Sequence, residues 1–146
     1  MREILFRGKR VDSGEWVYGN FIEDKWGDDN GNTIYAILQD RVAPDMAELW
    51  TPVRVIPETV GQFTGLTDKN GKKIFEGDIV KSWSSWWRMP GLIEVETYEV
   101  VCKHLGGLYL KRGTPNGEKS TSLNRSSTVE VIGNKWDNPE LLEVKE

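Results

Sequence analysis

The sequence predicts an all-β fold, mainly antiparallel, with one short helix at the C-terminal end. Apolar residues recur mostly at every second position, which is the spacing of strands and not of helices. Glycine, at 15 of 146 residues, and other turn-forming residues separate these short apolar segments. Tryptophan is abundant, with 7 copies, and aromatic residues favour strands.

The N-terminal part is expected to begin with a hairpin. Apolar alternation at residues 4–6, turn residues at 8–14 and renewed alternation at 16–22 predict two strands. A polar loop is expected at 24–32, followed by a third strand in the β-branched and aromatic run at 33–38. Residues 44–50 begin with a proline and are expected to form one or two helical turns.

The clearest turn lies in the middle of the chain. Asn70 and Gly71 stand between two apolar stretches and predict a hairpin, because both residues tolerate positive φ. A strand is expected to begin near Asp78 and to run toward the aromatic segment that follows. Between residues 92 and 103 the apolar positions change from one face to the other, which predicts a β-bulge or a broken strand.

The C-terminal part is expected to complete the sheet. Gly106-Gly107 predicts a further hairpin, the polar run 113–127 predicts a mobile surface loop, and residues 128–132 predict the final strand. A helix is expected at 138–143, since asparagine caps helices, proline suits the first helical position and an acid suits the positive end. No repeat or linker divides the sequence, so a single domain is predicted.

Composition restricts the class of protein. The charged fraction of 29% and hydrophobic fraction of 38% are typical of a globular chain. No run of about twenty apolar residues is present, and the first apolar segment is too short for a signal peptide, so a cytoplasmic protein without a membrane partner is expected. A single cysteine, Cys102, excludes an intramolecular disulfide. The net charge of −4 opposes broad attraction to nucleic acid.

Catalytic and metal-binding motifs are weak. Cys102 and His104 lie two apart and would share one face of a strand, as a nucleophile and its base require. A small core cysteine followed by a histidine at the strand end explains them better. The acidic loop at 24–32 lacks the ligand spacing of a calcium loop, and no phosphate-binding glycine motif is present. We therefore expect no catalytic residue, no cofactor and no metal, and an enzyme is the less favoured class.

The aromatic segment is the candidate interface. Trp83 and Trp87 would share one face of a strand and Trp86 the other, so at least one indole is expected outside a one-sided core. Tryptophan and arginine, here Arg88, are enriched in protein interfaces, while stacking of bases on the rings is an alternative use. Filling of the core by these rings is the competing structural interpretation.

Three blocks spread over the chain resemble the YopX family of small phage and prophage proteins. They read MREILFRGKR with GEWVYGNFIE, then PETVGQFTGLTDKNGKKIFEGDIV, then EVIGNKWDNPELL. The resemblance implies an N-terminal hairpin region at about 1–56 and an SH3-like barrel at about 57–136, and it brings no established activity, cofactor or catalytic residue. The chain departs from the family pattern at 81–90 and 113–127.

These observations predict a non-enzymatic binding or assembly module in a bacterial host cell. Its expected partners are a second copy of the chain, or a host or phage protein, bound through Trp83, Trp86, Trp87 and Arg88. The alternative is a nucleic-acid-binding small barrel, for which basic residues cluster at 7–10 and 69–73. That alternative rests on analogy of fold alone.

Overall fold

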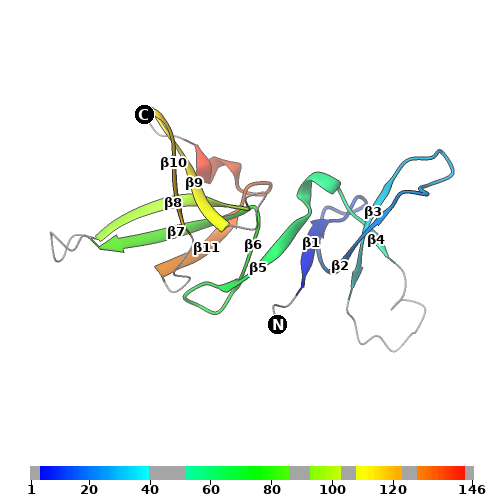
Figure 1. Ribbon diagram of the computed structural model, residues 1–146, viewed down its shortest axis with the longest axis horizontal. Coiled ribbons are helices and arrows are strands. Elements are labelled where there is room, and N and C mark those ends of the chain that lie inside the picture. Colours follow the sequence, from blue (N-terminus) through cyan, green and yellow to red (C-terminus); the bar gives the residue numbers. More distant parts are fainter. Residues whose placement is uncertain (1–3, 40–51, 86–92, 103–107, 123–127, 144–146) are drawn as a thin grey trace. The chain divides into compact units, whose positions relative to one another are not determined.

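The computed structural model describes residues 4–39, 52–85, 93–102, 108–122 and 128–143 (Figure 1). In these residues the chain is built almost entirely of β-strands, and the pairings between them are antiparallel, which confirms the predicted fold class. The chain divides into two compact units, Met1–Phe63 and Thr64–Glu146. Whether they form the single domain predicted from the sequence stays a prediction.

Unit 1 contains an antiparallel sheet in the order β4-β3-β2-β1-β5. The predicted N-terminal hairpin and third strand are both confirmed, because β1 pairs with β2 and β2 pairs with β3. Val17, Ile37 and Val55 are buried at the centre of its core. The elements are β1 (Phe6–Lys9), β2 (Trp16–Asp24), β3 (Ile34–Gln39), β4 (Val53–Arg54), the 3-10 helix η1 (Pro57–Thr59) and the start of β5 (Gly61–Thr67).

Unit 2 contains a five-stranded sheet in the order β10-β9-β8-β7-β11. The end of β5 and its neighbour β6 also belong to this unit, where the Thr64 hydroxyl donates to the carbonyl of Ile74 at 2.8 Å. Its core is a cluster around Ile74, Val80 and Val100. The elements are β6 (Lys73–Phe75), β7 (Asp78–Ser85), β8 (Ile93–Cys102), β9 (Leu108–Thr114), β10 (Gly117–Ser122), β11 (Val129–Asn134) and the 3-10 helix η3 (Pro139–Leu142).

The predicted hairpin at Asn70-Gly71 is confirmed and is fixed to β11. Asp68, only 5% exposed, accepts hydrogen bonds from the backbone N–H groups of Asn70 and Lys72, both at 2.9 Å. Its second carboxylate oxygen accepts from the N–H of Val131 at 3.0 Å. One carboxylate therefore closes the turn and attaches it to a strand about sixty residues later.

The bulge predicted between residues 92 and 103 is wrong. β8 pairs with β7 without a register shift from Ile93 to Glu99, and the described irregularity lies in β11, between Val131 and Gly133. The apolar positions change face because β8 is apolar on both sides. Tyr98 and Val100 enter the core on one face, and Val95 lies on the other, 46% exposed.

The predicted loop at 113–127 is wrong over its first part, where β9 and β10 form a hairpin that begins with the pair Thr114↔Gly117. β10 lies at the edge of the sheet and its residues 117–121 are exposed, so backbone pairing forms a strand without any apolar alternation in the sequence. The short helix predicted at 138–143 is not confirmed, because a four-residue 3-10 helix, η3, lies there. The SH3-like barrel expected at about 57–136 is not confirmed either, because the pairings of the described strands leave β10 and β11 as the two edges of an open sheet.

Candidate functional site

The five-stranded sheet of unit 2 divides along β8. Residues 99–102 of β8 pair with β9, whereas residues 93–98 have β7 as their described strand neighbour and none on the other side. β9 leaves β8 after Lys111, and residues 112–114 pair only with β10 among the described strands. Among the described residues, no strand therefore pairs with β8 at Val95–Thr97 on the side where Arg112 and Gly113 would have continued the sheet, and we call this the open edge of β8.

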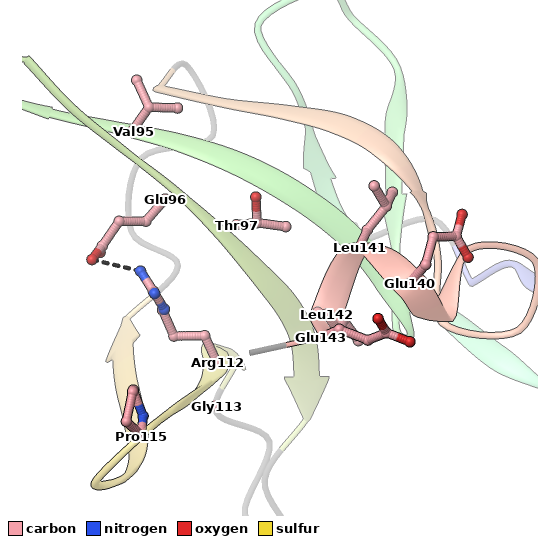
Figure 2. A pocket seen from close by; sticks show the side chains of 10 residues that line it. All are labelled: Val95, Glu96, Thr97, Arg112, Gly113, Pro115, Glu140, Leu141, Leu142 and Glu143. Carbon is pink, nitrogen blue, oxygen red and sulfur yellow. Dashed lines mark ion pairs between the residues drawn. The ribbon is translucent and has the colours of Figure 1, made fainter. Parts of the chain in front are cut away.

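A cavity of about 400 Å³ occupies this division of the sheet. Figure 2 shows Glu96 and Arg112 on one side of β8 and the residues of η3 on the other. Pro115 of the β9–β10 turn and residues of η3 both belong to its lining. Its walls are formed by Val95, Glu96, Thr97, Arg112, Gly113, Pro115, Glu140, Leu141, Leu142 and Glu143.

Glu96 links three strands across the division. Its carboxylate pairs with Arg112 of β9 at 2.7 Å and with Lys119 of β10 at 2.9 Å, and it accepts a hydrogen bond from the hydroxyl of Tyr98. Burial opposes the ionisation of Glu96, but these hydrogen bonds and positive charges outweigh it and hold its pKa below the ordinary value. Burial and then the bond to Glu96 raise the pKa of Tyr98. The cluster fixes the side chains around a gap that backbone pairing leaves open.

The η3 wall of the cavity differs in character. Leu141 is partly exposed, and Glu140 and Glu143 form no ion pair with any other described residue, whereas the cations Arg112 and Lys119 are both engaged by Glu96. The cavity thus combines apolar surface, an open strand edge and a negative side. Among the described residues that line it there is no histidine or cysteine.

Trp83 is the one member of the predicted interface that lies within the described residues. It stands in β7 directly opposite Val95, so the two side chains are neighbours on one face of the sheet, and Val95 also lines the cavity. The ammonium group of Lys69 lies 4.1 Å from the centre of the Trp83 ring. Trp86, Trp87 and Arg88 lie outside the described residues.

Basic residues of the two clusters predicted from the sequence, 7–10 and 69–73, contact aromatic rings or carboxylates of their own unit. The guanidinium of Arg7 and the ammonium of Lys9 lie 4.7 Å and 5.5 Å from the centre of the Trp16 ring. Arg10 pairs with Asp12 at 2.8 Å, an interaction that lowers the pKa of Asp12 to about 2. Lys69 also pairs with Glu130 at 3.6 Å. These contacts account for several of the charges that would otherwise be available to phosphate.

The remaining predictions concern a metal site, the acidic loop at 24–32, His104 and a membrane-spanning segment. Among the described residues no three His, Cys, Asp or Glu side chains form a group that could hold a metal ion. In the loop at 24–32, Asp24 and Asp28 accept backbone N–H groups of Trp26, Asn30 and Asn32. His104 and residues 44–50 lie outside the described residues. No helix in the described part of the chain is long and apolar enough to cross a membrane.

No local pattern in the sequence indicates the cavity of unit 2. In the sequence Glu96 resembles any acid on a solvated strand. The residues next to it do not indicate that it contacts Arg112 and Lys119, which lie sixteen and twenty-three positions later. The leucines after Pro139 indicate a packed C-terminal segment, but not that this segment lines a cavity together with residues of β8 and β9. Only the departure of β9 from β8 brings these residues together.

A solved structure has a similar fold. The crystal structure of protein EF1440 from Enterococcus faecalis is 24% identical to this chain, covers 98% of it with 100% of its own chain, and superposes with a TM-score of 0.50. At this identity the likeness concerns the fold alone. No curated protein matches the chain.

The family relationship extends over both units. The model of the family described as YopX protein matches residues 5–143, which includes the three blocks singled out from the sequence, except residues 1–4, and the cavity of unit 2. The chain belongs to the YopX family.

Proposed function

We propose that this protein is a non-enzymatic binding module that captures an extended, basic segment of a partner protein in the cavity of unit 2. As a member of the YopX family, it would act in the cytoplasm of a bacterium as a phage- or prophage-encoded protein. The observation that carries the proposal is the open edge of β8 at Val95–Thr97, next to a cavity of about 400 Å³.

The open edge favours an extended partner. A strand without a neighbour presents unpaired N–H and C=O groups, and peptides are commonly recognised by adding a strand at such an edge. The cavity provides space beside this edge, and Glu96, held by Arg112 and Lys119, forms a fixed wall. A preorganised site costs less ordering on binding than one that must form around its ligand.

The charge of the cavity favours a basic partner. Arg112 and Lys119 are compensated by Glu96, whereas Glu140 and Glu143 have no compensating cation among the described residues. A lysine or arginine side chain would place its charge at these carboxylates and its aliphatic stem along Leu141. Trp83 would extend this surface, because it adjoins Val95 at the cavity.

Nucleic acid binding is the second candidate. It rests on the SH3-like barrel implied by the family, on the exposed lysines of the Asn70-Gly71 hairpin and on the aromatic segment. The carboxylates of Glu140 and Glu143 would repel a phosphate backbone at the cavity. The net charge of −4 adds to this repulsion. We therefore place this candidate behind a protein partner.

The test combines capture with charge reversal. The tagged protein is incubated with bacterial lysate, with and without nuclease, and compared with the double variant Glu140→Lys/Glu143→Lys. The double variant Glu23→Lys/Glu58→Lys changes the net charge equally at exposed positions of unit 1 and is the matched control. The captured partner is then purified, and its affinity for each variant is measured by isothermal titration calorimetry.

We expect the captured partner to be a protein whose capture resists nuclease. Its affinity should fall at least tenfold for the cavity variant, which corresponds to about 1.4 kcal/mol, and less than threefold for the control. Equal affinity for both variants would show that the cavity is not the binding site. Capture that disappears with nuclease would favour the nucleic-acid candidate.

A further inference from the structure

Unit 1 carries an exposed indole and an unfilled apolar cavity on the same hairpin. Trp26, in the loop between β2 and β3, is 94% exposed. The cavity has a volume of about 240 Å³, and Asp28 and Thr33 of the same loop belong to its lining. Its walls are formed by Val11, Asp28, Thr33, Ile34, Tyr35, Arg54, Val55 and Pro57. Neither feature belongs to the binding cavity of unit 2.

The loop holds the indole in the exposed position. The N–H of Trp26 donates to the Asp24 carboxylate at 3.0 Å, and the N–H of Asp28 donates to the carbonyl of Asn32 at 3.1 Å. Gly27 has φ +71°, and a Cβ there would lie 2.2 Å from the Asn32 carbonyl oxygen, so only glycine permits this closure of the loop. The backbone around Trp26 is thus fixed before any partner binds.

The cavity is suited to an aromatic ring. An apolar cavity of about 150 Å³ can take up benzene, so a cavity of about 240 Å³ has room for the two rings of an indole. Val55 and Tyr35 provide apolar walls, and Val11 stands at the mouth, 60% exposed. Asp28 offers a hydrogen-bond acceptor, because its Oδ2 receives only a 3.3 Å contact from the amide of Asn32 among the described residues.

We propose that two copies of this chain associate by inserting Trp26 of each into the unit 1 cavity of the other. The indole is two residues from Asp28, which lines the cavity, so one small patch carries both the projecting side chain and the recess. A patch that contains both parts is self-complementary, and a two-fold axis satisfies both contacts at once. The occupant of the cavity is therefore a second copy and not an unrelated protein.

The expected affinity is modest. A buried tryptophan removes about 150–250 Å² from water, and stable interfaces bury about 1,200–2,000 Å² in total. Two indoles provide the centre of such an interface, and the sides of the hairpins would have to supply the rest. We expect a dissociation constant in the micromolar range, which is measurable by sedimentation velocity over protein concentrations of about 1–500 μM.

The experiment uses two variants that each remove one half of the contact. Trp26→Ala removes the indole, and Val11→Glu places a charge at the mouth of the cavity while leaving Trp26 in place. Ile4→Ala shortens another exposed apolar side chain, 68% exposed, and is the control. Circular dichroism and thermal melts of each variant establish that unit 1 is folded.

We expect the wild type and Ile4→Ala to dimerise, and each of the two variants alone to remain monomeric. An equimolar mixture of Trp26→Ala and Val11→Glu should associate, because the indole of the second fits the intact cavity of the first. Its affinity should be at least tenfold weaker than that of the wild type, since one of the two contacts is missing. A misfolded variant could not complement in this way.

Three outcomes would overturn the proposal. They are a wild type that stays monomeric over the whole concentration range, a variant that dimerises as well as the wild type, and a mixture of two monomeric variants that does not associate. The last would show that the variants act on different contacts. The lysate capture described for unit 2 is independent of all three.

Discussion

Asp68 shows how much structure a single residue can determine. Burial opposes the ionisation of this carboxyl group, but the N–H groups of Val131, Lys72 and Asn70 donate to it and hold its pKa below the ordinary value. The same turn also receives support from the N–H of Lys69, which donates to the carbonyl of Val129 at 3.0 Å. The turn and β11 therefore share one hydrogen-bonded cluster.

The substitution Asp68→Ala is expected to destabilise the protein by about 3 kcal/mol, because buried N–H groups lose an ionised acceptor. Urea unfolding followed by tryptophan fluorescence measures the difference. Asp29→Ala, at an exposed position of another loop, is the control and should change the free energy of unfolding by less than about 0.5 kcal/mol. Equal effects of the two substitutions would contradict the role given to Asp68.

Gly77 illustrates a second constraint at the residue scale. Its φ is +85°, and a Cβ would lie 2.4 Å from the ring of Trp136, whereas Gly71 has a similar φ of +81° with nothing within 4 Å of the same position. Gly71→Ala should cost about 1–2 kcal/mol from the backbone alone. Gly77→Ala should cost a further ~1–3 kcal/mol because the indole must move. Thermal melts of the two variants compare them, and equal losses would show that the ring is not in contact.

At the scale of the elements, the candidate site exists because β9 separates from β8 after Lys111. Glu96 holds the separated part together through Arg112 and Lys119, and its side chain is only 15% exposed. A depressed pKa in the folded state means that ionised Glu96 contributes stability above its ordinary pKa. That contribution is lost as the pH falls through the folded pKa.

The variant Glu96→Gln is therefore expected to be less stable than the wild type by about 1 kcal/mol near pH 7. The difference should shrink as the pH falls through the folded pKa of Glu96, because the wild-type carboxylate then becomes protonated as well. Urea unfolding over a series of decreasing pH values measures it, and Glu58→Gln, on the surface of unit 1, serves as the control. A difference that is independent of pH would show that the charge of Glu96 does not stabilise the division of the sheet.

Over the whole molecule, the two units have separate cores. Val17, Ile37 and Val55 form one, and the cluster around Val80 and Val100 forms the other. The hydrophobic stabilisation of each unit is thus largely its own, and local opening can follow these boundaries.

Gly77→Ala is expected to increase amide hydrogen exchange in the residues of unit 2 and to leave that of unit 1 nearly unchanged. Exchange followed by mass spectrometry of peptides from 4–39 and from 108–122 resolves the two responses. A uniform increase across both sets of peptides would show that the chain opens as one cooperative unit.

The sequence predicted most of the fold because its local patterns agreed with the final structure. Alternation gave the strands of the first hairpin, and Asn70-Gly71 gave the turn after β5, where positive φ is required whatever the surroundings. It failed at residues 117–122, since an exposed edge strand needs no apolar face, and at the predicted bulge, since β8 has apolar residues on both sides.

By itself the sequence determined the all-β class, the main turns and the family. Each of these depends on residues close together in the chain or on the three sequence blocks read in order. Only the tertiary structure decided where sites could form. The cavity beside β8 exists because two strands part, and the recess near Trp26 exists because residues from 11 to 57 surround it. Such sites depend on contacts between residues distant in the chain, and no local periodicity records them.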